Sequence, residues 1–464
     1  MNSCQDICRE TDALGAEFIE LSHRIWSNPE LAYNEFCSSR FIIDCMKKNG
    51  FEIKTGLAGI PTAFKAVYGS GKPVIGFLGE YDALPNLSQH AGVEYDSPLV
   101  PGGNGHGCGH NALGAGTALA VAALKNHMER HKVPGTIIFF GCPAEERGCG
   151  KSFMARAGVF DGVDAAVCWH PDDLNRIVNF PTLANIQVNF TFEGRPAHAS
   201  ACPEKGRSAL DAAELMNIGV QFLREHVPQT TRIHYAFQDA GGSSPNVVQS
   251  FSKLLYYIRC PKSVEAKEIF ERVVKIAQGA ALMTETELHY KIESGMTEFI
   301  PSQTLSRLAA SCWKEIGACE YSAEAHEIAD RFSRYLGEPL EENITSEIPE
   351  YVLSDIVLPA STDVGDVSFN VPTVMLMASS YVKGTTDHSR QLCAQVGSAV
   401  GDNALVHIAK VMAYTALKVL ENRQLADEAK AELIKATGGV YECLIPEDVQ
   451  PDIPETIPED YPCV

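Results

Sequence analysis

The sequence of 464 residues lacks any long apolar run. No stretch of about 18 consecutive apolar residues occurs, which is the length that a membrane-spanning helix needs. The first segment, MNSCQDICRETDALG, carries acidic side chains and no apolar centre, so we expect no secretory signal peptide. From these two absences we predict a cytoplasmic protein without a membrane partner.

Positive charge is also scarce. The chain has 38 Lys and Arg residues against 59 Asp and Glu residues, a formal net charge of −21 at pH 7. Phosphate backbones and anionic lipids repel such a chain, so we expect neither nucleic acid nor a membrane surface as its main partner. Residues 441–464 are rich in proline and acid, and we expect this tail to wrap over the surface or to stay mobile.

A disulfide framework is a third missing feature. The 15 cysteines are odd in number and scattered without regular spacing, which fits a reducing compartment better than a secreted scaffold. We therefore predict that cysteines outside the candidate site are small buried apolar groups or surface thiols.

The residues that are present indicate an α/β protein with more than one domain. A chain of this length exceeds the size at which one core keeps growing. Nearly continuous apolar runs at 73–81, 136–146 and 164–171 predict strands covered on both faces, as in a mostly parallel sheet. Helical spacing of apolar residues predicts helices at 11–28 and 111–125, between and before these strands.

The pattern changes near residue 184. Residues 184–194 alternate between apolar and polar, which predicts a half-exposed strand of an antiparallel sheet. Further strands and two helices follow up to about residue 300. We predict a catalytic domain in two parts, an inserted α+β domain and a tail, with the bounds 1–184, 185–300, 301–440 and 441–464.

One glycine-rich segment, PGGNGHGCGHNALGAG at 101–116, carries the first candidate ligands. His106, Cys108 and His110 stand at alternate positions, which in an extended backbone would place them on one side. Thiolate and imidazole are ligands of Zn²⁺ and related cations. The alternative is a turn with a buried thiol and two surface histidines.

Later segments add ligands at predicted strand ends. Glu145 and Glu146 end the strand at 136–146, and His170 ends the strand at 164–171. His388 follows in the segment TTDHSR. Two adjacent glutamates point in different directions, so one can bind a metal while the other transfers protons. A single structural zinc site is a poor alternative, because its ligands normally come as close pairs.

The order of these motifs resembles the M20 metallopeptidases, and within them the amidohydrolase branch, subfamily D. The motifs are HGCGH (106–110), PAEE (143–146), CWHP (168–171) and TDHS (386–389). Further segments are similar to the subgroup that contains the p-aminobenzoyl-glutamate hydrolase B subunit and related dipeptidases: GEYDALP (79–85), GHGCGHN (105–111), PNVVQ (245–249) and ASTDVGDVSF (360–369). The resemblance covers about residues 10–440.

The resemblance implies a phosphorylase/hydrolase-like metallopeptidase fold with an inserted lid and dimerisation domain. It implies two divalent metal ions per subunit, Mn²⁺ or Zn²⁺, with Cys108 as the bridge. The other implied ligands are His110, Glu146, His170 and His388.

Other residues take supporting roles by the same resemblance. Glu145 would be the general base that moves a proton from the attacking water to the leaving amine, and Asp82 would orient a ligand. Asp366 resembles a further acidic position near the site, and His106 would lie behind the ligands. Better-known members of the family have a histidine where Glu80 stands and an aspartate where Cys108 stands, so their metal identity does not transfer.

The inserted domain contributes three further candidates. The segment GRPAHAS (194–200) resembles the family's lid motif, in which His198 would reach the partner subunit's site and stabilise the tetrahedral oxyanion. Asn246 and Arg259 occupy positions that would hold the substrate's carboxylate. The alternatives are a surface histidine for His198 and a structural salt bridge for Arg259.

The function implied is that of a dinuclear-metal amidohydrolase that cleaves the amide bond of a small N-acyl amino acid such as p-aminobenzoyl-glutamate. One alternative is a dipeptidase for unusual dipeptides, and another is a regulatory subunit of a hetero-oligomeric amidohydrolase. We expect a small amide or dipeptide as the substrate partner. We also expect a homodimer through the inserted domain, or a hetero-oligomer with a related subunit.

Overall fold

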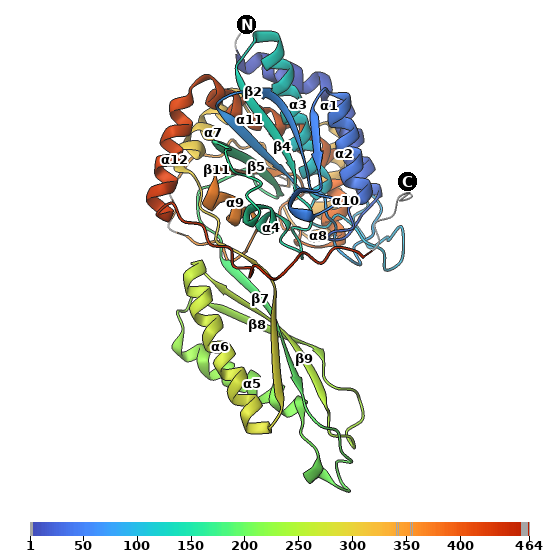
Figure 1. Ribbon diagram of the computed structural model, residues 1–464. Helices are drawn as coiled ribbons and strands as arrows, with labels where there is room; N and C mark the ends of the chain where they lie inside the picture. Colours follow the sequence, from blue (N-terminus) through green and yellow to red (C-terminus); the bar gives the residue numbers. More distant parts are fainter. Residues whose placement is uncertain are drawn as a thin grey trace.

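The structure is a computed structural model that describes residues 3–339, 341, 343–352, 354, 356–455 and 463. It has two bodies, a larger one around a seven-stranded sheet and a smaller one around a four-stranded sheet (Figure 1). The strands of the larger body are β1 (Glu52–Thr55), β2 (Phe64–Ser70), β3 (Val74–Gly79), β4 (Gly135–Gly141), β5 (Ala165–Asp172), β6 (Arg176–Val178) and β11 (Thr373–Ser379). Its helices are α1 (Ser3–Ser27), α2 (Phe36–Lys48), α3 (His110–His131), α4 (Gly150–Arg156), α7 (Gln303–Ile316), α8 (Ala323–Leu336), α9 (Val364–Asn370), α10 (Arg390–Val396), α11 (Ala399–Glu421) and α12 (Arg423–Thr437).

The centre of the larger sheet is parallel and its borders are antiparallel. The strand order is β1-β2-β4-β3-β5-β11-β6, and β4, β3, β5 and β11 run in the same direction. Strands β1, β2 and β6 join antiparallel at the two borders. The carboxyl ends of the four parallel strands therefore meet at one edge, where such sheets build their sites.

Helices cover both faces of this sheet. Helices α1, α2, α3, α7, α11 and α12 share a core with one face, while α4 and α9 pack on the other. All seven residues of β4 are buried, which explains why this strand has no polar face. The predicted α/β class with a largely parallel sheet is confirmed.

The smaller body is an antiparallel sheet with two helices. Its strands are β7 (Ala184–Glu193), β8 (Arg232–Asp239), β9 (Phe251–Cys260) and β10 (Glu287–Met296), in the order β10-β7-β9-β8. Helices α5 (Ala209–Leu223) and α6 (Ser263–Thr284) share its core. The prediction of a half-exposed strand is wrong for β7, which is almost wholly buried because it lies between β10 and β9. The proposed domain boundaries themselves stay predictions.

Several elements were not predicted from the sequence. They are the short strands β1 and β6 and the helices α8, α9, α10 and α12. β6 has three residues and α9 and α10 have seven each, too few to show a period in the sequence. Among the described residues, no helix combines the length and the apolar character that crossing a bilayer requires.

The described part of the tail, 441–455 together with Cys463, wraps over the molecule. It runs between the two bodies as the dark red segment in Figure 1. Leu444 joins the core of the smaller body, and Ile445 joins that of the larger body. Arg156 donates to the carbonyl of Val449 at 2.8 Å. Of the two expected states, wrapping therefore holds for this part, while 456–462 and 464 lie outside the described residues.

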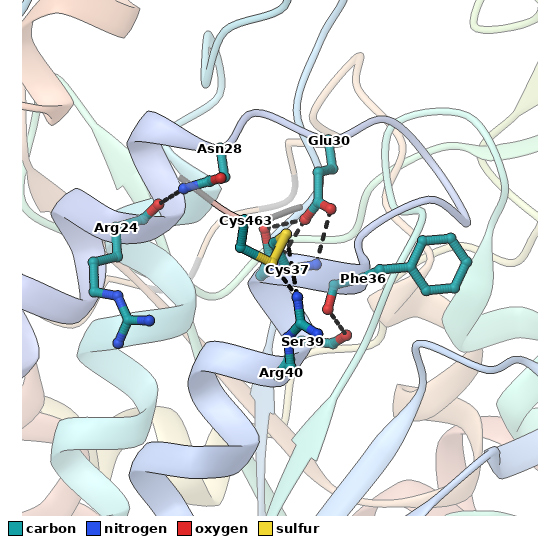
Figure 2. Close-up of a disulfide and its surroundings, with 9 residues drawn as sticks. Arg24, Asn28, Glu30, Phe36, Cys37, Ser39, Arg40 and Cys463 are labelled. Atoms are coloured by element: carbon teal, nitrogen blue, oxygen red, sulfur yellow. Dashed lines mark hydrogen bonds between the residues drawn. A yellow bond between two sulfur atoms is a disulfide. The ribbon is translucent and has the colours of Figure 1, made fainter. Parts of the chain in front are cut away.

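A disulfide joins the tail to α2. Cys37 and Cys463 are bonded across a separation of 426 residues, with Cα atoms 5.6 Å apart (Figure 2). Beside it, Glu30 accepts a hydrogen bond from the Cys37 amide at 2.8 Å. The expectation that these two cysteines are thiols is wrong, because no local spacing reveals a pair that only the wrapped tail brings together. The other 13 cysteines form no disulfide.

Candidate metal centre

The glycine-rich segment ends in a turn that leads into α3. The Gly109 amide donates to the His106 carbonyl at 3.2 Å, and α3 starts at His110. Gly109 has a φ of 75°, and a Cβ there would lie 2.8 Å from Pro171 Cγ. Only glycine fits this conformation and this close approach.

This turn separates the three candidate ligands of the segment. Cys108 Sγ lies 3.3 Å from His170 Nε2, and His110 faces the same region. His106 instead bonds to the Ile25 carbonyl at 3.1 Å. The argument from alternation is therefore wrong, because the backbone turns here and is not extended. The exclusion of His106 from the ligand set agrees with this geometry.

Two groups of potential ligands share Cys108. One consists of Cys108, His110 and His170, and the other of Cys108, Glu146 and His388. Within each group the ligand atoms lie within 4.8 Å of one another. His388 Nε2 is 3.5 Å from Glu146 Oε2. The structure thus brings together all five predicted ligands, from four separate segments, although their binding of metal stays a prediction.

Asp82 holds two members of the site in place. Its Oδ1 lies 2.9 Å from His110 Nδ1, and its Oδ2 accepts the Glu146 amide at 2.9 Å. Because Nδ1 of His110 is engaged by this carboxylate, the other ring nitrogen, Nε2, keeps its lone pair for a further partner. This nitrogen is buried without a hydrogen-bond partner in the described chain.

Glu80 is a member of the site that the sequence reasoning did not propose. Its Oε2 lies 3.3 Å from His110 Nε2, and its Oε1 lies 2.6 Å from Lys151 Nζ. Lys151 also contacts Asp363 Oδ1 at 2.6 Å, and all these side chains are buried. The available signal was an acidic residue one position after the covered strand β3.

Glu145 and Glu146 lie on a strained loop and not at the end of a strand. β4 ends at Gly141, so the predicted strand is too long. Ala144 has a φ of 61°, and His388, across the site, has a φ of 54°. Such left-handed conformations of non-glycine residues are concentrated at functional sites. Glu145 forms a further group of close potential ligands with Glu80 and His110.

Burial and neighbouring charges shift the pKa values of the site. Burial, and then the charge of Glu80, raise the pKa of Glu145 well above its usual range. Burial also raises the pKa of Glu146, while burial and the charge of His110 lower that of His170. For Asp82, burial is the largest single cause and would raise the pKa, but the charge and hydrogen bond of His110, the Glu146 amide and the charge of Lys151 together hold it below its usual value. The charged forms of Glu145 and Glu146 are thus disfavoured in the structure as it stands, and a bound cation would stabilise them.

The residues present fit divalent cations. Three buried atoms of this cluster have no hydrogen-bond partner among the described residues: Glu80 Oε2, His110 Nε2 and Glu146 Oε1. Buried polar atoms in proteins are almost always paired, so three such atoms in one cluster indicate a missing partner. Thiolate, imidazole and carboxylate together are the ligands that Zn²⁺ and Mn²⁺ accept.

Asp366 lies apart from the ligands. It accepts hydrogen bonds from Ser152 Oγ at 2.7 Å and from the Tyr441 hydroxyl at 2.8 Å. Neither contact joins it to the clustered ligand atoms. The acidic residue that does reach the site is Asp363, three positions earlier, through Lys151.

The candidates of the smaller body lie at its two ends. Arg259 is near the larger body, where its Nη1 donates to Ser361 Oγ at 3.2 Å and its Nε is buried without a hydrogen-bond partner in the described chain. His198 and Asn246 are exposed neighbours beyond the other end, in the loops that follow β7 and precede β9, where the Ala199 amide donates to the Asn246 carbonyl at 2.9 Å.

The length of β9 separates these two ends. Arg259 pairs with Asn185, and eight residues farther along the sheet Phe251 pairs with Glu193. At about 3.3 Å per residue, these pairs are about 26 Å apart. One chain therefore does not bring Arg259 and Asn246 together, contrary to the expectation that both hold the same carboxylate, unless a second subunit supplies one of them.

Comparison with known proteins agrees with the geometry of the site. Residues 76–418 match the model of "Peptidase family M20/M25/M40". The chain is 38% identical to the B subunit of p-aminobenzoyl-glutamate hydrolase from Escherichia coli, over 95% of this chain and 97% of that protein. It is 29% identical to the mouse Xaa-Arg dipeptidase, over 93% and 91%. Its fold is similar to that of a dinuclear metal-binding M20 peptidase from Bacillus subtilis, with a TM-score of 0.58, 18% identity and coverage of 88% and 99%.

Proposed function

Because the chain belongs to peptidase family M20/M25/M40 and is a metal-dependent hydrolase of amide or peptide bonds, we propose that it cleaves a small N-acyl amino acid such as p-aminobenzoyl-glutamate with two divalent cations. The observation that carries this proposal is the sharing of Cys108 by two groups of ligands. A thiolate in that position suits a bridge between two cations. The substrate class is supported by the 38% identical relative, whose name specifies it.

The proposed mechanism assigns the proton transfer to Glu145. When bound, Mn²⁺ or Zn²⁺ would polarise the substrate's carbonyl and lower the pKa of the attacking water. Glu145 accepts the proton of that water and returns it to the nitrogen of the leaving amine. Its burial and the nearby charge of Glu80, which raise its pKa, suit a group that must hold a proton between these two steps.

Two buried groups position the ligands. Asp82 engages Nδ1 of His110, so that Nε2 would be left to bind a metal. Lys151 engages Glu80 Oε1 and leaves Oε2 turned toward His110. We include Glu80 among the ligands, since it supplies a buried oxygen where family members supply an imidazole.

The proposed recognition of the substrate's carboxylate uses Arg259. Its guanidinium is partly buried, and its Nε has no partner in the described chain. Its neighbour Ser361 precedes Asp363, which contacts Lys151 of the site. An arginine with a free buried donor beside a catalytic cluster suits a carboxylate, which it can grip with two parallel hydrogen bonds.

His198 and Asn246 would act on a neighbouring subunit. They lie in the loops beyond Glu193 and Phe251, at the end of the sheet that is about 26 Å from Arg259. We propose a dimer through the smaller body, in which His198 stabilises the oxyanion in the partner's site. A related subunit could take the place of the second copy, and the E. coli relative, which is named as one subunit of its enzyme, favours testing this.

A dipeptidase is the second candidate, and the relative named Xaa-Arg dipeptidase supports it. Both candidate functions hydrolyse an amide bond, and they differ in the part of the substrate that the site has to accept. A regulatory subunit without its own activity is a weaker alternative, because the general base and all predicted ligands are present and clustered.

Hydrolysis by the purified chain tests the proposal. The panel contains p-aminobenzoyl-glutamate, N-acetyl amino acids and dipeptides, each with Mn²⁺ or Zn²⁺ and each with a chelator. We expect chelator-sensitive release of glutamate from p-aminobenzoyl-glutamate. Release from dipeptides alone would favour the second candidate, and no release by a folded, metal-loaded chain would favour a subunit that needs a partner.

A further inference from the structure

A second group of metal-type ligands lies where α1 packs against the last turns of α3. Its members are Asp6 on α1 and His127 and His131 on α3. Helix α3 begins at His110 in the candidate metal centre and ends at His131. At about 1.5 Å per residue, the two groups are about 30 Å apart. The mechanism proposed above uses none of the three residues.

The three side chains converge on one point. His131 Nε2 lies 2.6 Å from Asp6 Oδ2, and His127 Nδ1 lies 3.9 Å from the same oxygen. The two imidazole rings have centroids 4.4 Å apart. Ligands bound tetrahedrally to Zn²⁺ at about 2.1 Å are about 3.4 Å from one another, so these spacings match a cation after small side-chain shifts.

His127 has no other role that its contacts explain. It is 3% exposed, and its Nδ1 is buried without a hydrogen-bond partner in the described chain. This nitrogen points toward Asp6, which is 2% exposed. His131 follows His127 by four positions, a spacing that places both on one face of a helix. The unpaired Nδ1 of His127, buried beside a carboxylate and a second imidazole, indicates a missing partner such as a cation.

The surrounding charges allow a cation. Arg9 donates to Asp6 Oδ1 at 2.7 Å, which leaves Oδ2 for the histidines. Arg130 pairs with Glu10 at 2.5 Å, so its charge is offset.

We propose that Asp6, His127 and His131 bind a divalent cation of the Zn²⁺ type, which ties α1 to the end of α3. Two imidazole nitrogens and one carboxylate oxygen are ligands that Zn²⁺ accepts, and the half-exposed His131 leaves room for a water molecule as the fourth. The cation would be a structural clamp, remote from the centre of chemistry.

Metal content of the full chain tests this assignment. Wild type, His131→Ala and His127→Ala are stripped with a chelator, equilibrated with buffered Zn²⁺ and analysed for zinc per chain. His326→Ala, which removes an exposed imidazole from α8, is the matched control. We expect both cluster variants to bind one Zn²⁺ fewer than wild type and control, with kcat/KM unchanged at 25 °C.

Equal zinc contents of wild type and His131→Ala would overturn the proposal and leave only a hydrogen-bonded cluster. His131→Ala decides the matter if the buried His127→Ala does not fold. A second measurement compares two variants that both carry Cys108→Ala, so that the candidate metal centre contributes equally to each. Zn²⁺ should raise the Tm of Cys108→Ala more than that of Cys108→Ala/His131→Ala. Equal rises would contradict a cation at Asp6.

Discussion

The two bodies of the molecule contribute different parts of the proposed reaction. The larger body brings all five predicted ligands and the general base to the edge of a parallel sheet, where their side chains are held by buried partners. The smaller body carries its candidates apart, with Arg259 at one end of an antiparallel sheet and His198 and Asn246 in the loops at the other end. A parallel sheet gathers its strand ends at one edge, whereas a long antiparallel strand keeps its ends apart. We therefore expect changes in the larger body to act on the chemical step, and changes in the smaller body to depend on subunit pairing or on the substrate.

The largest effect should come from Glu145→Gln in the larger body. The amide cannot accept a proton, so we expect kcat to fall by about 10²–10⁴-fold. The metal content should stay at the wild-type level, because the proposed ligands are untouched. Turnover and metal analysis are measured together, with Glu129→Gln, an exposed site on α3, as the control. Unchanged turnover would remove Glu145 as the base.

His198→Ala tests whether the smaller body takes part in the chemistry. Loss of one oxyanion donor should lower kcat by about 10²–10³-fold while leaving fold and metal content intact. Mixed oligomers of His198→Ala and Glu145→Gln should regain part of the activity, because one of their sites then combines an intact base with an intact His198. Absence of recovery would place His198 outside the partner's site and would contradict the proposal that the smaller body acts through subunit pairing.

Asp82→Asn tests how far the larger body depends on its supporting groups. The amide keeps the shape but weakens the hold on His110 Nδ1, and loss of such a partner typically costs about 10–100-fold in metal affinity or activity. Metal titration of wild type and variant measures this. A variant with wild-type affinity and activity would show that His110 needs no orienting carboxylate.

Arg259→Ala tests recognition of the substrate by the smaller body. We expect KM to rise about tenfold for a substrate with a free carboxylate, the loss of about one charge-assisted hydrogen bond, with little change in kcat. Arg259→Lys keeps the positive charge but cannot form two parallel hydrogen bonds to a carboxylate, so its KM should lie between those of wild type and Arg259→Ala. Equal effects on an amide-blocked analogue would contradict carboxylate recognition.

The smallest effect concerns Asp366, which binds the tail at the junction of the two bodies. Burial raises the pKa of Asp366 to about 7, from an ordinary value of 3.8. The folded chain thus holds this proton more tightly than the unfolded chain. The stability that this provides is present below about pH 4 and is lost as the pH rises through about 7. Between pH 5 and pH 8, Asp366→Asn should therefore lose less stability than wild type in denaturant titrations; identical losses would refute the assignment.

Much of the centre was accessible from the sequence because its residue types are chemically restricted. Cys108, His110, Glu146 and His170 stand beside covered strands or glycine turns, and few roles suit them there. Glu80 was missed as a member of the site, although it directly follows a covered strand, because its distance to His110 is set by the fold. His106 was separated from its neighbours by a turn that the alternating pattern does not show.

The sequence by itself determined most of the strands, the family and the residue types of the candidate site, because hydrophobic period and motif spacing are local properties of the chain. Contacts across long separations were decided only by the tertiary structure. Cys37 meets Cys463 after the tail has wrapped around the molecule, and Asp6 meets His127 where two helices pack. The distance between Arg259 and Asn246 also belongs to this class, because it depends on how the strands of the smaller sheet pair. Such contacts arise from packing, which no short stretch of residues encodes.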